Sequence, residues 1–192
     1  MYCIIFALFS RRHKFTLSLE HTAILIQAIA QKKQNKKLVQ RLSRLPEKKI
    51  DTLFHDLHQE VFEEMDCLTC ANCCKTTSPI FRNIDIERLS KRLKTSPSQF
   101  IASNLKMDHE GDYVLQHSPC LFLGEDNKCS VYEDRPLACR EYPHTNRKKM
   151  HQILNLTRKN TEICPAVSQI FQKLQQVNFV VSLFCWLGFD FG

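Results

Sequence analysis

The chain has 192 residues, of which 43% are hydrophobic and 24% charged, so its length and composition fit one ordinary globular domain with an extension. Only four glycines are present, and neither G-x-G-x-x-G nor G-x-x-x-x-G-K-[ST] occurs, which argues against a glycine-rich nucleotide-binding site. The net charge of +7 is unevenly spread. Residues 1–50 carry 11 Lys and Arg against 2 Asp and Glu, whereas residues 51–192 carry 16 against 18.

Apolar spacing and capping residues predict several helices along the chain. They are expected at residues 16–31, at 47–66 directly after Pro46, from Asn83 or Asp85 to Leu93, from Pro97 to Leu105, and from Pro165 onward. Residues 32–45 are basic and are interpreted as a linker or a helix extension. A strand is predicted at 112–116, and a hairpin from 121–123 and 130–132. Residues 147–157 fit a helix or a strand.

Cysteine is the unusual residue, with ten in the chain. Four of them stand in the string Cys67-Leu-Thr-Cys70-Ala-Asn-Cys73-Cys74, in which two Cys-x-x-Cys turns share Cys70. Two thiolates at this spacing can converge on one metal ion, and backbone N–H groups of the turn support their charge. The candidate metal ligands are Cys67, Cys70, Cys73, Cys74, Cys120, Cys129, Cys139 and Cys164, whereas Cys3 and Cys185 are expected to be ordinary apolar residues.

The identity of the metal stays open at this point, because thiolate-rich sites suit zinc, copper(I) and iron–sulfur clusters. Eight cysteines would fill two four-cysteine zinc sites, or one iron–sulfur cluster with four thiols left over. The spacing of Cys67, Cys70 and Cys73, together with Cys164-Pro165, is similar to bacterial ferredoxins, although Cys74 is foreign to that pattern. Adjacent side chains diverge, so Cys73 and Cys74 could serve different sites.

Basic and histidine residues accompany the later cysteines. Arg135 and Arg140 could hydrogen-bond a metal-bound sulfur or form ordinary salt bridges. His117 and His144 are interpreted as helper or surface residues, since cysteines alone already supply the usual number of ligands.

The order of these motifs is specific. Cys-x-x-Cys-x-x-Cys-Cys is followed by Pro119-Cys120, then by Cys129-Ser-Val-Tyr132-x-x-Arg135-Pro136-x-x-Cys139-Arg140-x-Tyr142-Pro143, and finally by Cys164-Pro165. Over about residues 50–175 the chain resembles the YkgJ family of bacterial cysteine-cluster proteins. The resemblance implies a zinc- or iron-chelating domain. Longer flagellin-lysine methylating proteins carry a similar cysteine domain, but this chain has little room for a separate methyl-donor domain.

Neither end of the chain resembles an export signal or a membrane anchor. Residues 2–9 are apolar but precede the basic cluster, and the apolar run at 177–191 is interrupted and shorter than a spanning helix. A cytoplasmic protein with reduced thiols is therefore expected, which favours metal binding over disulfides. Basic residues within 11–49 could meet nucleic acid or an anionic surface, although a solvated helix face is the favoured interpretation.

These observations predict a mostly helical α+β domain with short strands, organised around a cysteine-ligated metal centre. Three segments are expected: a basic N-terminal helix or extension at 1–45, the cysteine-cluster domain at 46–176 and an apolar tail at 177–192. The predicted function is to chelate zinc or iron, with no catalytic constellation identified. The alternatives are an iron–sulfur redox or methylase-like enzyme module, and a nucleic-acid or membrane-surface module whose metal is structural.

Overall fold

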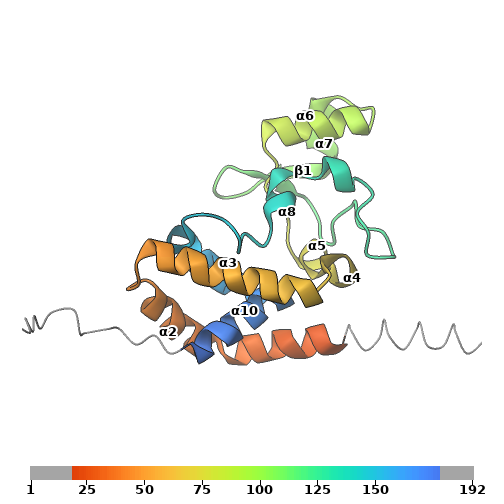
Figure 1. The fold of residues 1–192 in the computed structure, drawn as a ribbon. Coiled ribbons are helices and arrows are strands. Elements are labelled where there is room, and N and C mark those ends of the chain that lie inside the picture. Colours follow the sequence, from red (N-terminus) through yellow and green to blue (C-terminus); the bar gives the residue numbers. More distant parts are fainter. Residues whose placement is uncertain (1–18, 178–192) are drawn as a thin grey trace, which may run out of the picture.

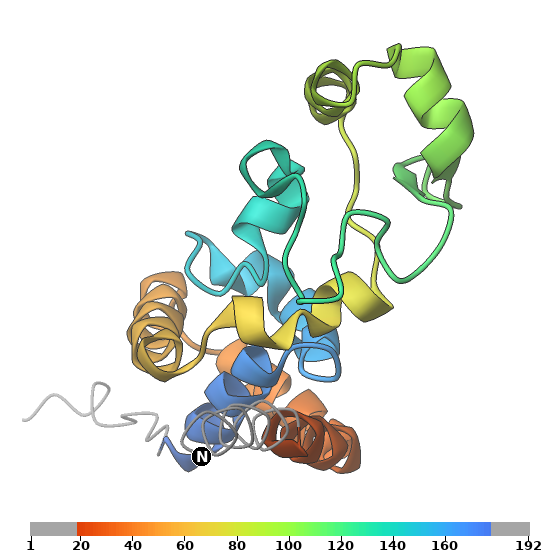
Figure 2. The same ribbon diagram turned by 90° about the vertical axis from the view of Figure 1, so that its right-hand side faces the viewer.

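Two groups of buried apolar side chains organise residues 19–177, the part of the chain that the computed structural model describes. The first core collects side chains between Leu38 and Val61 and between Met150 and Leu174, and the second collects side chains between Phe81 and Val131. We call the surrounding parts the first lobe (residues 32–64 and 150–176) and the second lobe (residues 81–131). Helices α4 and α5, yellow in Figures 1 and 2, lie between the two lobes.

Residues 19–30 are helical, and the elements that follow are mostly short helices. They are α2 (Lys32–Leu42), α3 (Glu47–Glu64), α4 (Cys67–Cys70), α5 (Asn72–Thr76), α6 (Asn83–Arg92), α7 (Pro97–Asn104), β1 (Leu105–Met107), β2 (Tyr113–Leu115), the 3-10 helix η1 (Tyr132–Asp134), α8 (Leu137–Glu141), the 3-10 helix η2 (Met150–Ile153), α9 (Leu154–Asn160) and α10 (Pro165–Gln176). The expected class, a mostly helical α+β domain, is confirmed. That a metal centre organises this domain stays a prediction.

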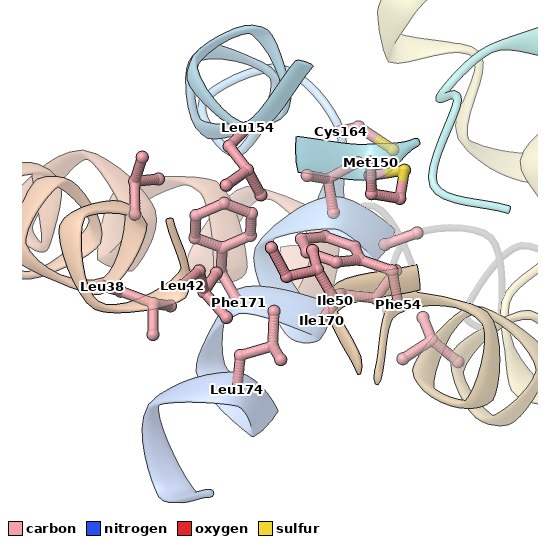
Figure 3. Close-up of a cluster of buried hydrophobic side chains, with 14 residues drawn as sticks. Leu38, Leu42, Ile50, Phe54, Met150, Leu154, Cys164, Ile170, Phe171 and Leu174 are labelled. Carbon is pink, nitrogen blue, oxygen red and sulfur yellow. The ribbon is translucent and has the colours of Figure 1, made fainter. Parts of the chain in front are cut away.

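The first core forms where α3 packs on α10 and η2. Phe54 of α3 meets Phe171 of α10 edge to face, with ring centroids 6.3 Å apart (Figure 3). Hydrogen bonds also join α3 to the start of η2. The carboxylate of Asp51 in α3 accepts the backbone N–H groups of Lys149 and Met150 at 2.9 and 2.8 Å. Segments about a hundred residues apart in sequence are thereby held together.

The second core is built from α6, α7 and the antiparallel pair β1–β2, in which Leu105 faces Leu115. A buried carboxylate connects this lobe to the segment that follows it. Asp85 pairs with Arg88 at 2.6 Å and accepts the backbone N–H of Leu137 at 3.2 Å, at the start of α8. Arg88 also donates to the carbonyls of Asp134 and Arg135. These bonds fix the position of the short helix that carries Cys139.

The element predictions are confirmed for α3, α6, α7, β2 and α10, and for the described part of 16–31. Of the alternatives left open, the helix is confirmed for the basic segment 32–45, which contains α2, and for residues 150–157, which lie in η2 and α9. Two details differ. The helix predicted from Pro97 ends at Asn104, and Leu105 starts β1 instead. The predicted hairpin is reduced to one bridge, Leu123 to Cys129, with backbone hydrogen bonds from Gly124 to Lys128 and from Ser130 to Phe122 beside it.

The ends of the chain limit two further predictions. Cys3, Cys185 and nearly all of the predicted tail lie outside the described residues. The predicted boundary at residue 45 stays a prediction, although Leu38 and Leu42 of α2 contribute to the first core. Within residues 19–177, no helix combines the length and the apolar character needed to cross a membrane.

Candidate metal centre

A sharp turn divides the cysteine string into two very short helices. Asp66 caps α4, where its side chain accepts the backbone N–H of Leu68 at 2.9 Å. Ala71 then adopts a left-handed conformation with φ 49°, which ends α4 and redirects the chain into α5. Cys67 and Cys70 therefore lie on α4, whereas Cys73 and Cys74 lie on α5.

The first thiol group consists of Cys67, Cys70, Cys73 and Cys164. Cys164 precedes α10 and is a buried member of the first core. The Asn72 side chain brings α5 to the same place, since its Nδ2 donates to the carbonyl of Ile163 at 2.7 Å. Burial raises the pKa of Cys164 to about 12, and negative charge on Cys67 and Cys70 contributes to the rise. Thiols nearly a hundred residues apart in sequence therefore act on one another electrostatically.

The second thiol group consists of Cys74, Cys120, Cys129 and Cys139. The backbone N–H of Cys120 donates to the carbonyl of Cys74 at 2.8 Å, and Cys129 faces Leu123 across the bridge. Cys120 and Cys129 also pack against the second core. Burial raises the pKa of Cys139 to about 12, and the charges of the other three thiols of this group add to that effect.

The two groups adjoin at Cys73 and Cys74, whose sulfurs lie 4.0 Å apart. The hydrogen bond between these sulfurs lowers the pKa of Cys74 to about 7 and raises the pKa of Cys73, which is consistent with Cys73 donating to a Cys74 thiolate. The Cys74 charge reaches members of both groups, since it also raises the pKa values of Cys67 and Cys70. Cys74 therefore occupies the junction between the groups.

The two arginines near Cys139 differ in their surroundings. Arg135 stacks on the Tyr132 ring at 3.6 Å from its centroid. Burial raises the pKa values of Cys129 and Cys139, and the positive charge of Arg135 partly offsets that rise. Its Nη1 donates to the carbonyl of Tyr132 at 2.9 Å, so both predicted roles of Arg135, the sulfur hydrogen bond and the salt bridge, stay predictions. Arg140 instead helps to line a cavity of about 560 Å³. The other lining residues are Arg82, Glu141, His144, Asn146, Arg147 and Lys148.

The sequence analysis did not single out Tyr142, which lies beside the first thiol group. Its hydroxyl is buried and has no hydrogen-bond partner within the described residues. Burial raises the pKa of Tyr142, and charges on Cys164 and Cys73 add to the rise, so these thiols lie within electrostatic reach of the ring. The motif Cys139-Arg140-x-Tyr142-Pro143 contained this residue, but the pattern alone does not show which way the hydroxyl points.

The donor chemistry of the two groups fits a thiophilic metal, because all eight predicted cysteines are free and only partly exposed, apart from exposed Cys67 and buried Cys164. As they stand, however, no three Cys, His, Asp or Glu side chains within residues 19–177 are close enough together to hold an ion. The histidines are placed as expected of helper or surface residues. His144 lies 3.9 Å from Glu141, and His117 is exposed.

The fold and these thiol groups define a small cysteine-rich α+β domain. Residues 66–165 match the family model CxxCxxCC, described as a "putative zinc- or iron-chelating domain", and this segment contains all eight candidate cysteines. The chain therefore belongs to the CxxCxxCC family, with which the resemblance to YkgJ proteins is consistent. No curated protein and no solved structure matches the chain significantly.

Proposed function

We propose that this protein binds zinc or iron through its eight clustered cysteines. The observation that carries the proposal is the presence of eight free thiols, from five separate chain segments, on α4 and α5 and on segments bonded to or near them. Membership of a family described as zinc- or iron-chelating supports the same function.

The polar surroundings of the thiols favour metal over simple burial. A metal-bound thiolate is a strong hydrogen-bond acceptor, and metal sites regularly place a donor beside their ligands. The unpartnered hydroxyl of Tyr142 is such a donor next to the first thiol group. Arg135 supplies positive charge next to the second group. When bound, zinc would supply a structural cross-link, and an iron–sulfur cluster would supply electron transfer as well.

A second candidate function is an iron–sulfur redox or protein-modifying module. The Cys67-x-x-Cys70-x-x-Cys73 spacing favours it, together with Cys164 directly before a proline, because bacterial ferredoxins use this arrangement. The absorption spectrum separates the two functions, since zinc is colourless and an iron–sulfur cluster is brown.

The direct test is elemental analysis with an absorption spectrum, on full-length protein purified without oxygen. We expect zinc or iron at one or more equivalents per chain. Cys70→Ser, at the residue that both turns share, should reduce the metal content. The matched variant Cys3→Ser, which also removes one thiol, should leave it unchanged. Metal-free protein whose cysteines form native disulfides in non-reducing mass spectrometry would contradict the proposal.

A further inference from the structure

We infer that the chain holds two metal ions in separate four-thiol centres, and that the neighbouring residues Cys73 and Cys74 belong to different centres. The first thiol group (Cys67, Cys70, Cys73, Cys164) would bind one ion, and the second (Cys74, Cys120, Cys129, Cys139) the other. This inference rests on the proposed metal-binding function and adds the number of ions and the assignment of their ligands.

Backbone and side-chain contacts hold the first thiol group together without involving the second lobe. The Asn72–Ile163 hydrogen bond connects the start of α5 to the residue before Cys164. The Ala71 turn ends α4 and redirects the chain into α5, with the N–H of Ala71 donating to the carbonyl of Cys67 at 3.1 Å. Cys164 is itself buried in the first core. A metal ion here would therefore connect α4 and α5 to the first lobe.

A different set of contacts holds the second group. The Cys120–Cys74 backbone hydrogen bond joins α5 to the loop of the second lobe. Ser130, next to Cys129, donates its N–H to the carbonyl of Phe122 at 2.8 Å, which keeps Cys129 near Cys120. The bond from Leu137 to Asp85 holds α8, and with it Cys139, against the same lobe. A metal ion here would connect α5 to the second lobe.

The assignment of Cys74 to the second group follows from the helix and from ligand number. Consecutive residues of a helix project in directions about 100° apart, so Cys73 and Cys74 can ligate different ions even though their sulfurs lie only 4.0 Å apart. The Cys74 carbonyl already contacts Cys120. Four thiolates complete a structural zinc site, and placing Cys74 with Cys120, Cys129 and Cys139 gives both groups that number.

The experiment is a cobalt(II) titration of the metal-free full chain under reducing, anaerobic conditions, with cobalt as a visible probe for a zinc-type site. Charge-transfer absorbance from thiolate to cobalt should rise until about two equivalents per chain are bound, because each centre takes four ligands. Cys164→Ser and Cys139→Ser should each lower the endpoint to about one equivalent, and the double variant should bind none. Cys185→Ser, whose thiol is in neither group, should keep the endpoint of the native chain.

The outcomes separate the inference from the function on which it rests. An endpoint of about one equivalent in the native chain would overturn the two-centre arrangement while leaving metal binding intact. A single substitution that abolishes all binding would also overturn it, because the eight thiols would then form one shared centre. If the native chain binds no cobalt and is purified without zinc or iron, the proposed function itself fails. The native titration needs no variant, so misfolding of a substituted chain cannot hide the result.

Discussion

The hydroxyl of Tyr142 is buried, has no hydrogen-bond partner among the described residues, and lies within electrostatic reach of four thiols. A buried hydroxyl without a partner costs about 1–3 kcal/mol of folding free energy. A metal-bound thiolate would give this hydroxyl an acceptor, so the cost would disappear on metal binding. The residue therefore connects the stability of the metal-free chain to metal affinity.

Tyr142→Phe should have opposite effects on these two properties. The metal-free protein should become more stable by about 1 kcal/mol, because the unpartnered hydroxyl is removed. The metal affinity should fall about tenfold, because a hydrogen bond to a ligand is lost. Chemical denaturation and competition with a coloured chelator measure the two effects. In the control Tyr132→Phe, at an exposed ring, both quantities should stay unchanged, and a Tyr142→Phe protein with native affinity would exclude this role.

At the scale of elements, the end of α6 shows how the backbone limits the choice of side chain. Thr95 donates its N–H to the carbonyl of Ser90 at 3.0 Å, and Lys94 to that of Lys91 at 3.2 Å, which is a Schellman motif. Lys94 adopts φ 55° in this motif, in the left-handed region that favours glycine.

Two lysine-to-glycine substitutions in α6 should therefore change stability in opposite directions. Lys94→Gly should raise the free energy of unfolding by about 0.5–1 kcal/mol, because glycine adopts the left-handed conformation without steric cost. Lys91→Gly, three residues earlier and equally exposed, should lower it by about 1 kcal/mol, the usual penalty inside a helix. Urea denaturation of the two variants measures both changes. Destabilisation by Lys94→Gly would show that the Lys94 side chain stabilises the helix end.

The elements that the sequence predicted share a clear physical signal. In α3 the apolar spacing runs over 18 residues, and in α7 the Ser96 cap, Pro97 and Gln99 mark the first turn. Helices α4, α5 and α8 have four or five residues, too few for any period to be recognised. Leu105 was placed in a helix because its apolar side chain continued the α7 pattern, whereas pairing with Leu115 puts it in β1.

At the scale of the whole molecule, metal binding is expected to hold the two lobes together. A metal that binds the folded chain alone stabilises it by about 4 kcal/mol at a free concentration a thousandfold above the Kd. For a chain of this length, that corresponds to a rise in Tm of about 8–16 °C. Calorimetry with and without a zinc-binding chelator should show this difference, whereas a calcium-selective chelator should change little. Equal Tm values would show that the metal is not part of the folded structure.

The candidate site shows which features of a metal centre the local sequence can predict and which depend on contacts between distant segments. Cys67, Cys70 and Cys73 were recognisable because thiols at Cys-x-x-Cys spacing are a local signal, whereas the four later cysteines were assigned from their number and from the family resemblance. Two four-cysteine sites were one of the alternatives, but the sequence could not assign Cys120 and Cys164 to either, because that depends on packing between distant segments. The role of Asn72, which positions α5 beside Ile163, has no local signal either.

In the sequence, the residues of the second core lie between the two segments that form the first core. This arrangement also sets the order in which the protein can fold as it is synthesised. The second core is complete once Val131 has been made, whereas the first needs Leu174. At about 5–20 residues per second, the apolar stripe of α3 would wait roughly 5–20 seconds for η2 and α10 to leave the ribosome. During that interval Phe54 and Val61 have no partner from the C-terminal segment, so in the newly made chain α3 depends on η2 and α10 to cover its apolar stripe.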